Sequence, residues 1–344
     1  MSLIMMESCD LPSVAGAKWD LITTTNFAQT VDSRTCWTIA DSRDEGLRKN
    51  FAAQEDDTII LGFRHYKTGL SATNNAGSIM SFWGDGGTVL HLTVETPNSD
   101  GSIDVRRAGT TILGTSAAGV LSLIGAWQYI EVKVLISDTV GTVDVVVDGV
   151  NVLSLTNQDT RNGGTDALID QVRIGSQNTA NNAATAVRDI VIMNEQGSSL
   201  NDFLGPVIVE ARLADGAGDN TDWTPNTGAN FQAVDDPGVN DGDTTYVEST
   251  AAADRDDYTF ADLSAITTAP VAVQAHVIAR YDATPLDVAT YLRRSATNDD
   301  GTAETPAGSY GSRALTIWET DPVAVGAWTL ANFNATNFGI VSSS

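Results

Sequence analysis

The segment 125–155 constrains the fold most strongly, because it reads as three consecutive β-strands joined by short turns. Apolar and polar residues alternate from Trp127 to Ile136 and again from Thr142 to Val147. Alternation of period two is typical of an antiparallel strand with one buried face. Asp148-Gly149, before the third strand, is a two-residue loop that favours a tight hairpin. The segment therefore predicts a β-meander whose apolar face must be covered by a second sheet. Its polar residues are expected to face solvent: Glu131, Lys133, Asp144 and Asp148.

Short strands of this kind recur along the whole chain at intervals of about ten residues, which is typical of β-sandwiches. A chain of 344 residues is long for one sandwich and comfortable for two. Gly205-Pro206 interrupts strand pairing, and the apolar pattern restarts at Val207, so a boundary is expected there. We therefore predict an all-β fold with two tandem, jelly-roll-like β-sandwich domains, residues 1–205 and 206–344.

The charge balance limits the partners that the chain can have. It contains 44 acidic and 19 basic residues, which gives a formal net charge of −25, and no lysine follows Lys133. A field of this sign repels nucleic acids and anionic membranes. We therefore expect neither nucleic acid nor membrane as a partner.

The two cysteines, Cys9 and Cys36, resemble neither a disulfide framework nor a metal site in their spacing. Free thiols are therefore expected, as in a protein made in a reducing compartment. The N-terminus lacks the basic and apolar regions of a signal peptide. No apolar run approaches the roughly 18 residues of a membrane span. We expect the chain to be made in the cytoplasm.

Aspartates cluster in two loops of the second half of the chain. Calcium is bound by loop carboxylates and carbonyl oxygens, so a structural calcium ion is the one cofactor that the sequence suggests. Turns are rich in aspartate in any case, and solvated turns remain the alternative. The candidate ligands are Asp235, Asp241 and Asp243, with Asp236 in the same loop and Asp254, Asp256 and Asp257 in the second.

A set of short motifs runs along nearly the whole chain. The first domain has Glu7-x-x-Asp10 before Lys18-Trp19, the Trp127–Val132 strand, the Asp148-Gly149 hairpin and the stretch Asn201–Gly205. The second has Trp223, Val234-Asp235-Asp236, the segment Asp241–Val247, Trp328-Thr329 and Phe338-Gly339. In this order the motifs resemble tailed-bacteriophage structural proteins with a laminin-G or concanavalin-A-like jelly roll. The resemblance implies a virion component that assembles with other virion proteins as a homo-oligomer, such as a trimer.

Exposed aromatic residues are the candidates for glycan binding, since jelly-roll lectins bind sugars with aromatic side chains and loop carboxylates. Most tryptophans of a sandwich belong to its core. Trp83, beside a glycine-rich turn, and Trp223, in a long polar segment, are the two candidates.

Catalytic motifs are incomplete. Jelly rolls that hydrolyse β-glucans carry Glu-x-Asp-x-x-Glu, which places the carboxylates on one face of a strand. Glu55-Asp56-Asp57 begins this motif, but Ile60 occupies its last position. Glu319-Thr320-Asp321 begins it again, with Ala324 at the end. The histidines have no zinc-site spacing: His65, His91 and His276. We therefore expect no enzymatic activity.

These observations together predict a non-enzymatic virion structural protein that is associated with the tail or a fibre and engages host-surface carbohydrate. A capsid decoration or collar protein that stabilises the particle is the alternative. A glycan hydrolase is the third hypothesis, and its motif is missing.

Overall fold

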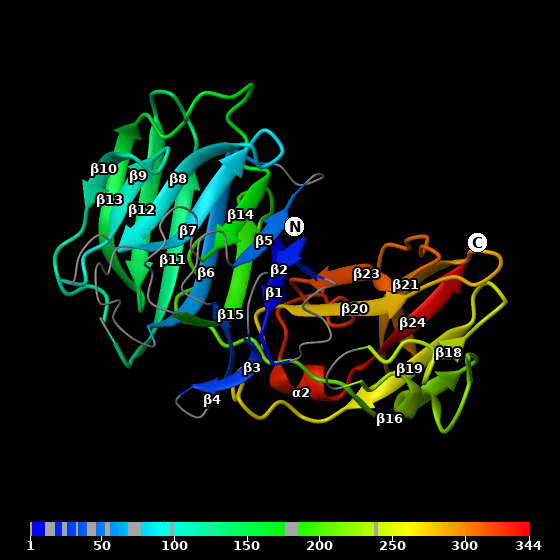
Figure 1. Cartoon of the computed structure of the whole chain (residues 1–344). Helices are drawn as coiled ribbons and strands as arrows, with labels where there is room; N and C mark the ends of the chain where they lie inside the picture. Colours follow the sequence, from blue (N-terminus) through cyan, green and yellow to red (C-terminus); the bar gives the residue numbers. More distant parts are fainter. Residues whose placement is uncertain are drawn as a thin grey trace. The chain divides into compact units, whose positions relative to one another are not determined.

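In a computed structural model of the chain, almost every regular element is a β-strand (Figure 1). The predicted all-β fold class is therefore confirmed. The chain divides into two compact units, here called unit 1 and unit 2, between Val209 and Glu210. Among the described residues, no helix is long and apolar enough to cross a lipid bilayer. The structure describes residues 2–10, 18–22, 26–31, 34–39, 46–51, 56–67, 77–96, 100–122, 124–175, 185–236 and 240–344.

Unit 1 is built from two antiparallel sheets. The first has eight strands, and β1 (Leu3–Glu7) pairs with its strand β15. The other seven follow in the order β13 (Val150–Gln158), β12 (Gly141–Val147), β11 (Trp127–Leu135), β6 (Thr58–Lys67), β15 (Thr185–Asn194), β4 (Arg34–Ile39) and β3 (Asn26–Val31).

The second sheet of unit 1 has seven strands. Their order is β10 (Thr111–Thr115), β9 (Asp104–Arg107), β8 (Val89–Thr96), β7 (Gly77–Gly84), β14 (Gln171–Ile174), β5 (Leu47–Asn50) and β2 (Leu21–Ile22).

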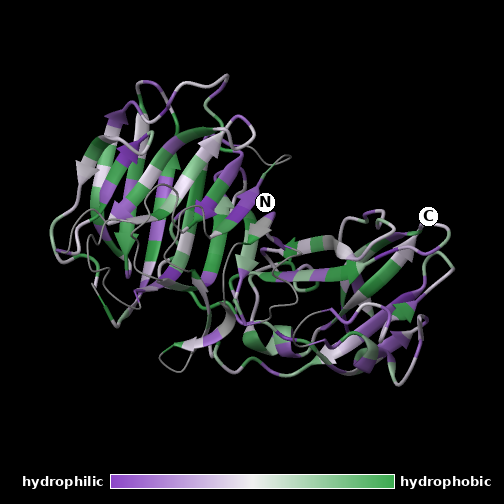
Figure 2. Cartoon of the chain, viewed as in Figure 1, coloured by the Kyte–Doolittle hydropathy of each residue, from purple (hydrophilic) through white to green (hydrophobic). Residues whose placement is uncertain are grey.

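The predicted meander is present as β11, β12 and β13. Its apolar face is buried as expected, with Ile130, Val132 and Val134 fully inaccessible to solvent. Asp148 and Gly149 both adopt positive φ, 49° and 79°, as the hairpin loop requires. Figure 2 shows the corresponding alternation of apolar and polar residues along the strands of unit 1.

The prediction that Glu131 faces solvent is wrong, since its side chain is only 1% exposed. The stretch Asn201–Gly205 lies against the outer side of β11, where the backbone amides of Leu204 and Gly205 each donate to the Glu131 carboxylate at 2.9 Å. Lys133 and Asp144 are half-buried and Asp148 is exposed. A segment that follows the last strand thus covers a polar face that the alternation alone assigns to water.

Unit 2 has a five-stranded antiparallel sheet and two small sheets. The five strands are β16 (Ala214–Thr221), β19 (Arg255–Phe260), β24 (Asn337–Ser343), β21 (Asp287–Arg294) and β22 (Thr297–Asp300). The small sheets pair β20 (Val273–Ala279) with β23 (Gly311–Trp318), and β17 (Thr224–Pro225) with β18 (Val247–Glu248). Two short helical turns complete the unit, η1 (Asn230–Ala233) and α2 (Leu330–Asn334).

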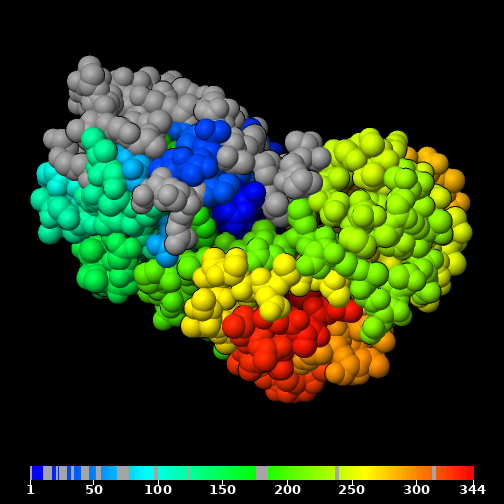
Figure 3. Space-filling model, turned by 90° about the horizontal axis from the view of Figure 1, so that it is seen from below, coloured from blue at the N-terminus to red at the C-terminus, as the bar shows by residue number. Residues whose placement is uncertain are grey.

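The core of unit 2 lies between β20–β23 and the five-stranded sheet. Its buried members are Val273, Leu292, Trp318, Trp328 and Phe338. The C-terminal strand β24 pairs with both β19 and β21. Figure 3 shows this C-terminal part of the chain (red) beside sequence-distant parts of unit 2 (yellow and orange).

Both cysteines are buried free thiols, as the sequence predicts. Burial raises the pKa of the Cys9 thiol well above its ordinary value. This thiol is therefore protonated and unreactive at neutral pH.

Candidate functional site

The outer face of the seven-stranded sheet carries a row of polar side chains around one tryptophan. Phe82, Leu92 and Val172 are fully buried on its inner face and stand in register with one another. Because side chains alternate along a strand, their neighbours point to the outer face. We call these neighbours the outer row: Arg48 and Asn50 on β5, Gln171 and Arg173 on β14, Ser81 and Trp83 on β7, Thr93 and Glu95 on β8, and Asp104 and Arg106 on β9.

Trp83 lies near the middle of the outer row and is half-buried. The guanidinium carbon of Arg173 lies 3.7 Å from the centroid of its ring, within the range of a cation–π contact. The indole Nε1 donates to the Ser81 hydroxyl at 2.8 Å. These contacts fix the plane of the indole. Of the two predicted glycan-binding residues, Trp83 is the one that the fold places among other polar side chains of the outer row.

The turn after Trp83 ties β7 to β14. The Asp170 carboxylate accepts hydrogen bonds from the amides of Gly86 (2.5 Å) and Gly87 (3.2 Å). Arg173 Nη2 donates to the Gly87 carbonyl at 3.1 Å. Gly87 has a φ of +76°, and a Cβ there would lie 2.2 Å from Gln171 Nε2. The positive φ favours glycine at this position, and any side chain there would also have to displace the end of Gln171.

Planar polar groups continue the outer row from Trp83 across β14 and β5. Gln171 Nε2 donates to Asn50 Oδ1 at 2.6 Å, and Arg173 Nε donates to the side-chain oxygen Oε1 of Gln171. Arg48 lies directly opposite Arg173 on the neighbouring strand. Its Nε is buried and has no hydrogen-bond partner.

At the other side of the outer row, Arg106 joins two carboxylates. Its Nε lies 3.2 Å from Glu95 and its Nη2 lies 2.7 Å from Asp104. Glu95 and Asp104 face one another in register on β8 and β9. Burial raises the pKa of Glu95, although the Thr93 hydroxyl and Arg106 oppose this shift.

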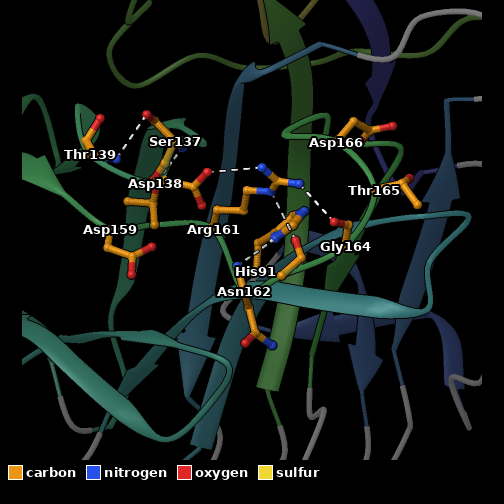
Figure 4. A network of polar contacts seen from close by, with 12 residues as sticks. His91, Ser137, Asp138, Thr139, Asp159, Arg161, Asn162, Gly164, Thr165 and Asp166 are labelled. Carbon is orange, nitrogen blue, oxygen red and sulfur yellow. Dashed lines mark hydrogen bonds and ion pairs between the residues drawn. The ribbon is translucent and has the colours of Figure 1, made fainter.

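One end of unit 1 is closed by the segment that follows β13, shown close up in Figure 4. Arg161 pairs with Asp138 at 3.0 Å and donates to the carbonyls of Gly163 and Gly164. The Asn162 amide donates to His91 Nδ1 at 3.2 Å, so this ring nitrogen is an acceptor (Figure 4). Burial lowers the pKa of His91. The ring is therefore a neutral packing residue beneath the segment.

His65 is also buried, and its burial lowers its pKa to about 4. It lines a cavity of about 30 Å³ together with Phe63 and Lys67. A cavity of this size holds about one water molecule and no larger ligand.

The aspartates proposed as calcium ligands are engaged within unit 2. Asp241 accepts from the Thr245 amide and hydroxyl, and Asp243 pairs with Arg280 and accepts from the Tyr310 hydroxyl. Asp235 is half-buried. In the described ranges, no three acidic, histidine or cysteine residues are grouped to hold a metal ion. The calcium site stays a prediction.

Trp223, the other glycan-binding candidate, lies in unit 2 and is half-buried. Its Nε1 donates to the Asp254 carbonyl at 3.1 Å, which anchors the indole to the turn before β19. In the first incomplete hydrolase motif, Glu55-Asp56-Asp57, residue Glu55 lies outside the described residues. Asp321, in the other, is fully buried and pairs with Arg294 at 2.8 Å.

No protein-family model matches the sequence, and no curated protein matches it. Among solved structures, alginate lyase vAL-1 from Chlorella virus is similar, with 12% identity, a TM-score of 0.41, and coverage of 56% of this chain and 99% of that one. Alginate lyase Aly36B in complex with an alginate trisaccharide matches with 13% identity, a TM-score of 0.32, and coverage of 47% and 82%. Trypanosoma rangeli sialidase matches with 12% identity, a TM-score of 0.34, and coverage of 50% and 29%. At these values the likeness concerns the fold and does not extend to activity.

These matches contradict the function that the sequence predicts. A tail- or fibre-associated virion structural protein was expected, or else a capsid decoration or collar protein. The matching structures named above are alginate lyases and a sialidase, and none of their names describes a virion structural protein. The stretch Asn201–Gly205, one of the motifs that suggested a virion protein, binds the buried Glu131.

Proposed function

We propose that the outer face of the seven-stranded sheet in unit 1 binds a polysaccharide chain, and that the protein acts by binding without catalysis. The observation that carries the proposal is the outer row, in which the immobilised indole of Trp83 is flanked by planar polar side chains. Aromatic faces stack on the apolar faces of sugar rings. Guanidinium and amide groups supply the directed hydrogen bonds that orient a ligand in such a site.

The shape of the face favours an extended ligand. Arg48, Arg173, Ser81, Thr93 and Arg106 stand in register across five neighbouring strands. With strands spaced by about 4.8 Å, this line spans roughly 19 Å. Ser81 and Thr93 are fully buried, so the half-buried arginines of this line offer the contacts, and their spread favours several linked sugars over a single one.

The side chains of the outer row favour binding over catalysis. None of them is histidine, the side chain that most often serves as a base near neutral pH. The two carboxylates, Glu95 and Asp104, are both joined to Arg106. An ion pair of this kind stabilises the charged form of a carboxylate.

Glycan hydrolysis is the second candidate, because Glu95 and Asp104 face one another across β8 and β9 and burial raises the pKa of Glu95. Retaining glycosidases use two carboxyl groups about 5 Å apart, one of them protonated. Release of reducing ends from a bound polysaccharide by the wild type, and its loss in Glu95→Gln, would favour this candidate over binding alone.

Replacement of Trp83 by alanine is expected to weaken polysaccharide binding roughly tenfold, because the stacking surface is lost. Affinity electrophoresis against neutral and acidic polysaccharides, followed by calorimetry on those retained, measures this effect. Trp83→Phe should keep much of the affinity, since an aromatic ring remains. Trp223→Ala is the matched control, a half-buried tryptophan of unit 2, and should bind as the wild type does. Failure of the wild type to bind any polysaccharide would contradict the proposal.

A further inference from the structure

We infer that Arg48 and Arg173 form a subsite for the carboxylate group of an acidic sugar. This inference rests on the proposed function and names the class of polysaccharide. The two arginines are paired directly across β5 and β14, on the same face of the sheet. Residues paired in this way have Cβ atoms about 5 Å apart, and like charges there destabilise the sheet. An anion between the two guanidinium groups would remove this repulsion.

Arg48 has a donor that awaits an acceptor. Its Nε is buried and makes no hydrogen bond, and the described part of the chain contains no ion pair of Arg48. A buried donor without a partner lowers stability. This is unusual in a chain with 44 acidic and 19 basic residues. Between described residues, ion pairs are seen for these arginines: Arg64, Arg106, Arg107, Arg161, Arg188, Arg212, Arg255, Arg280, Arg293 and Arg294.

Arg173 is held in place before any ligand arrives. Its guanidinium group stacks on Trp83, donates to the Gly87 carbonyl and donates to Gln171. A guanidinium group that is already oriented loses little freedom on binding. The subsite is therefore preorganised on one side and completed by Arg48 on the other.

The chemistry of the pair favours a carboxylate on a sugar. Two guanidinium groups present planar arrays of donors that match the two oxygens of a carboxylate. Trp83 lies against Arg173, which covers one face of its ring, so one unit of a chain could stack on the other face of the indole while an acidic group meets the arginines. Asn50 is exposed and adds an amide group that suits the hydroxyls of the same or a neighbouring sugar. A polyuronate has a carboxylate and hydroxyl groups in every sugar unit.

The test compares each acidic polysaccharide with a form whose carboxylates are neutral. Native polygalacturonate and alginate are measured against their own esterified forms, which keep the backbone and lose the charge. Wild-type protein should bind the native polymers about 10- to 100-fold more tightly, as expected for charged hydrogen bonds. Arg48→Gln should lose this preference and still bind the esterified form as well as the wild type does. Arg48→Lys should be intermediate, because it keeps the charge and loses the planar array.

Arg107→Gln is the matched control, since Arg107 lies on the same sheet, outside the outer row, and pairs with Asp159. It should keep the preference. If Arg48→Gln still prefers the native polymers to their esterified forms, the inference is wrong. It is also wrong if the wild type prefers only dextran sulfate to dextran, because the bound anion would then be a sulfate. Equal binding of native and esterified polymers, with Trp83→Ala weakening both, would also overturn it and leave the polysaccharide face intact. Absence of all binding would overturn both proposals.

A second measurement needs no polysaccharide. If Arg48 and Arg173 repel one another, added sodium chloride should raise the melting temperature of the wild type more than that of Arg48→Gln, because salt screens the repulsion. An equal salt response in the two proteins would mean that Arg48 already has a counter-charge, and the subsite would be wrong.

Discussion

Replacement of Asp257 by alanine is expected to destabilise unit 2 by about 3 to 5 kcal/mol, the range found when one partner is removed from a buried charged network. Asp257 lies on β19 and is fully buried. Its carboxylate accepts five hydrogen bonds: from the amides of Asp219 and Asn220, the side chains of Asn220 and Asn337, and the Tyr291 hydroxyl. Without it, these donors lose their acceptor in a place that water does not reach.

The pKa of Asp257 reflects the same network. Burial would raise it, but the hydrogen bonds from Asp219, Asn337 and Asn220 outweigh burial and lower it. A carboxyl group whose pKa is lower in the folded state stabilises the fold above its unfolded pKa, and this contribution is lost as the pH falls through the folded value. The loss caused by Asp257→Ala should therefore be largest at neutral pH and smaller in strong acid.

Urea denaturation of the full chain, with amide hydrogen exchange of β19 and β24 as the local probe, measures the effect. The matched control is Asp300→Ala. The Asp300 side chain is 42% exposed and pairs with Arg255, so its removal should cost less than about 1 kcal/mol. Equal losses in the two variants would contradict a structural role for the Asp257 network.

The strands were the most predictable part of the fold, because their signals are local. Alternation in β11 and the Asp148-Gly149 loop are contained within a few residues, and both predictions are confirmed. The prediction that Glu131 faces solvent is wrong because its burial depends on Leu204 and Gly205, which lie far along the chain. A period-two pattern predicts which residues share a face of the strand. Whether that face is exposed to solvent depends on which other segment packs against it.

The outer row could not be found from sequence for the same reason. Its members come from five strands between Arg48 and Arg173, and each looks like an ordinary polar strand residue. Only Trp83 had a local signal, an aromatic residue beside a glycine-rich turn. The nearest available hint for the rest was Gln171-x-Arg173, two long polar side chains on one face of a short strand. Assembly of the face requires the register of β5 with β14 and of β14 with β7.

Replacement of Asp256 by asparagine is expected to stabilise unit 2 by about 2 to 3 kcal/mol at pH 8 and to change little at pH 4. Asp256 is fully buried, and its Oδ1 has no hydrogen-bond partner. Burial raises its pKa to about 6, against the hydrogen bonds from Asn230 and Tyr258, and the charges of Asp257 and Asp222 add to the rise. The fold therefore favours the protonated form.

The direction of the pH effect follows from the two pKa values of Asp256. In the unfolded chain this carboxyl group titrates near 3.8, and in the fold near 6. Its favourable contribution is complete below the lower value and is lost as the pH rises through the higher one. A shift of about two units corresponds to about 3 kcal/mol. Asparagine cannot ionise and keeps an oxygen for Asn230 and Tyr258, so the variant avoids this loss.

Thermal unfolding of wild type and Asp256→Asn between pH 4 and pH 8 tests this expectation, with amide exchange of β19 assigning the change to unit 2. Asp262→Asn, at an exposed aspartate, removes the same charge from the surface and should shift stability by no more than about 0.5 kcal/mol. A gap between wild type and Asp256→Asn that stays constant with pH would mean that Asp256 does not titrate in this range. The gap should instead open between about pH 4 and pH 6, because in that interval the carboxyl group is ionised in the unfolded chain and still protonated in the fold.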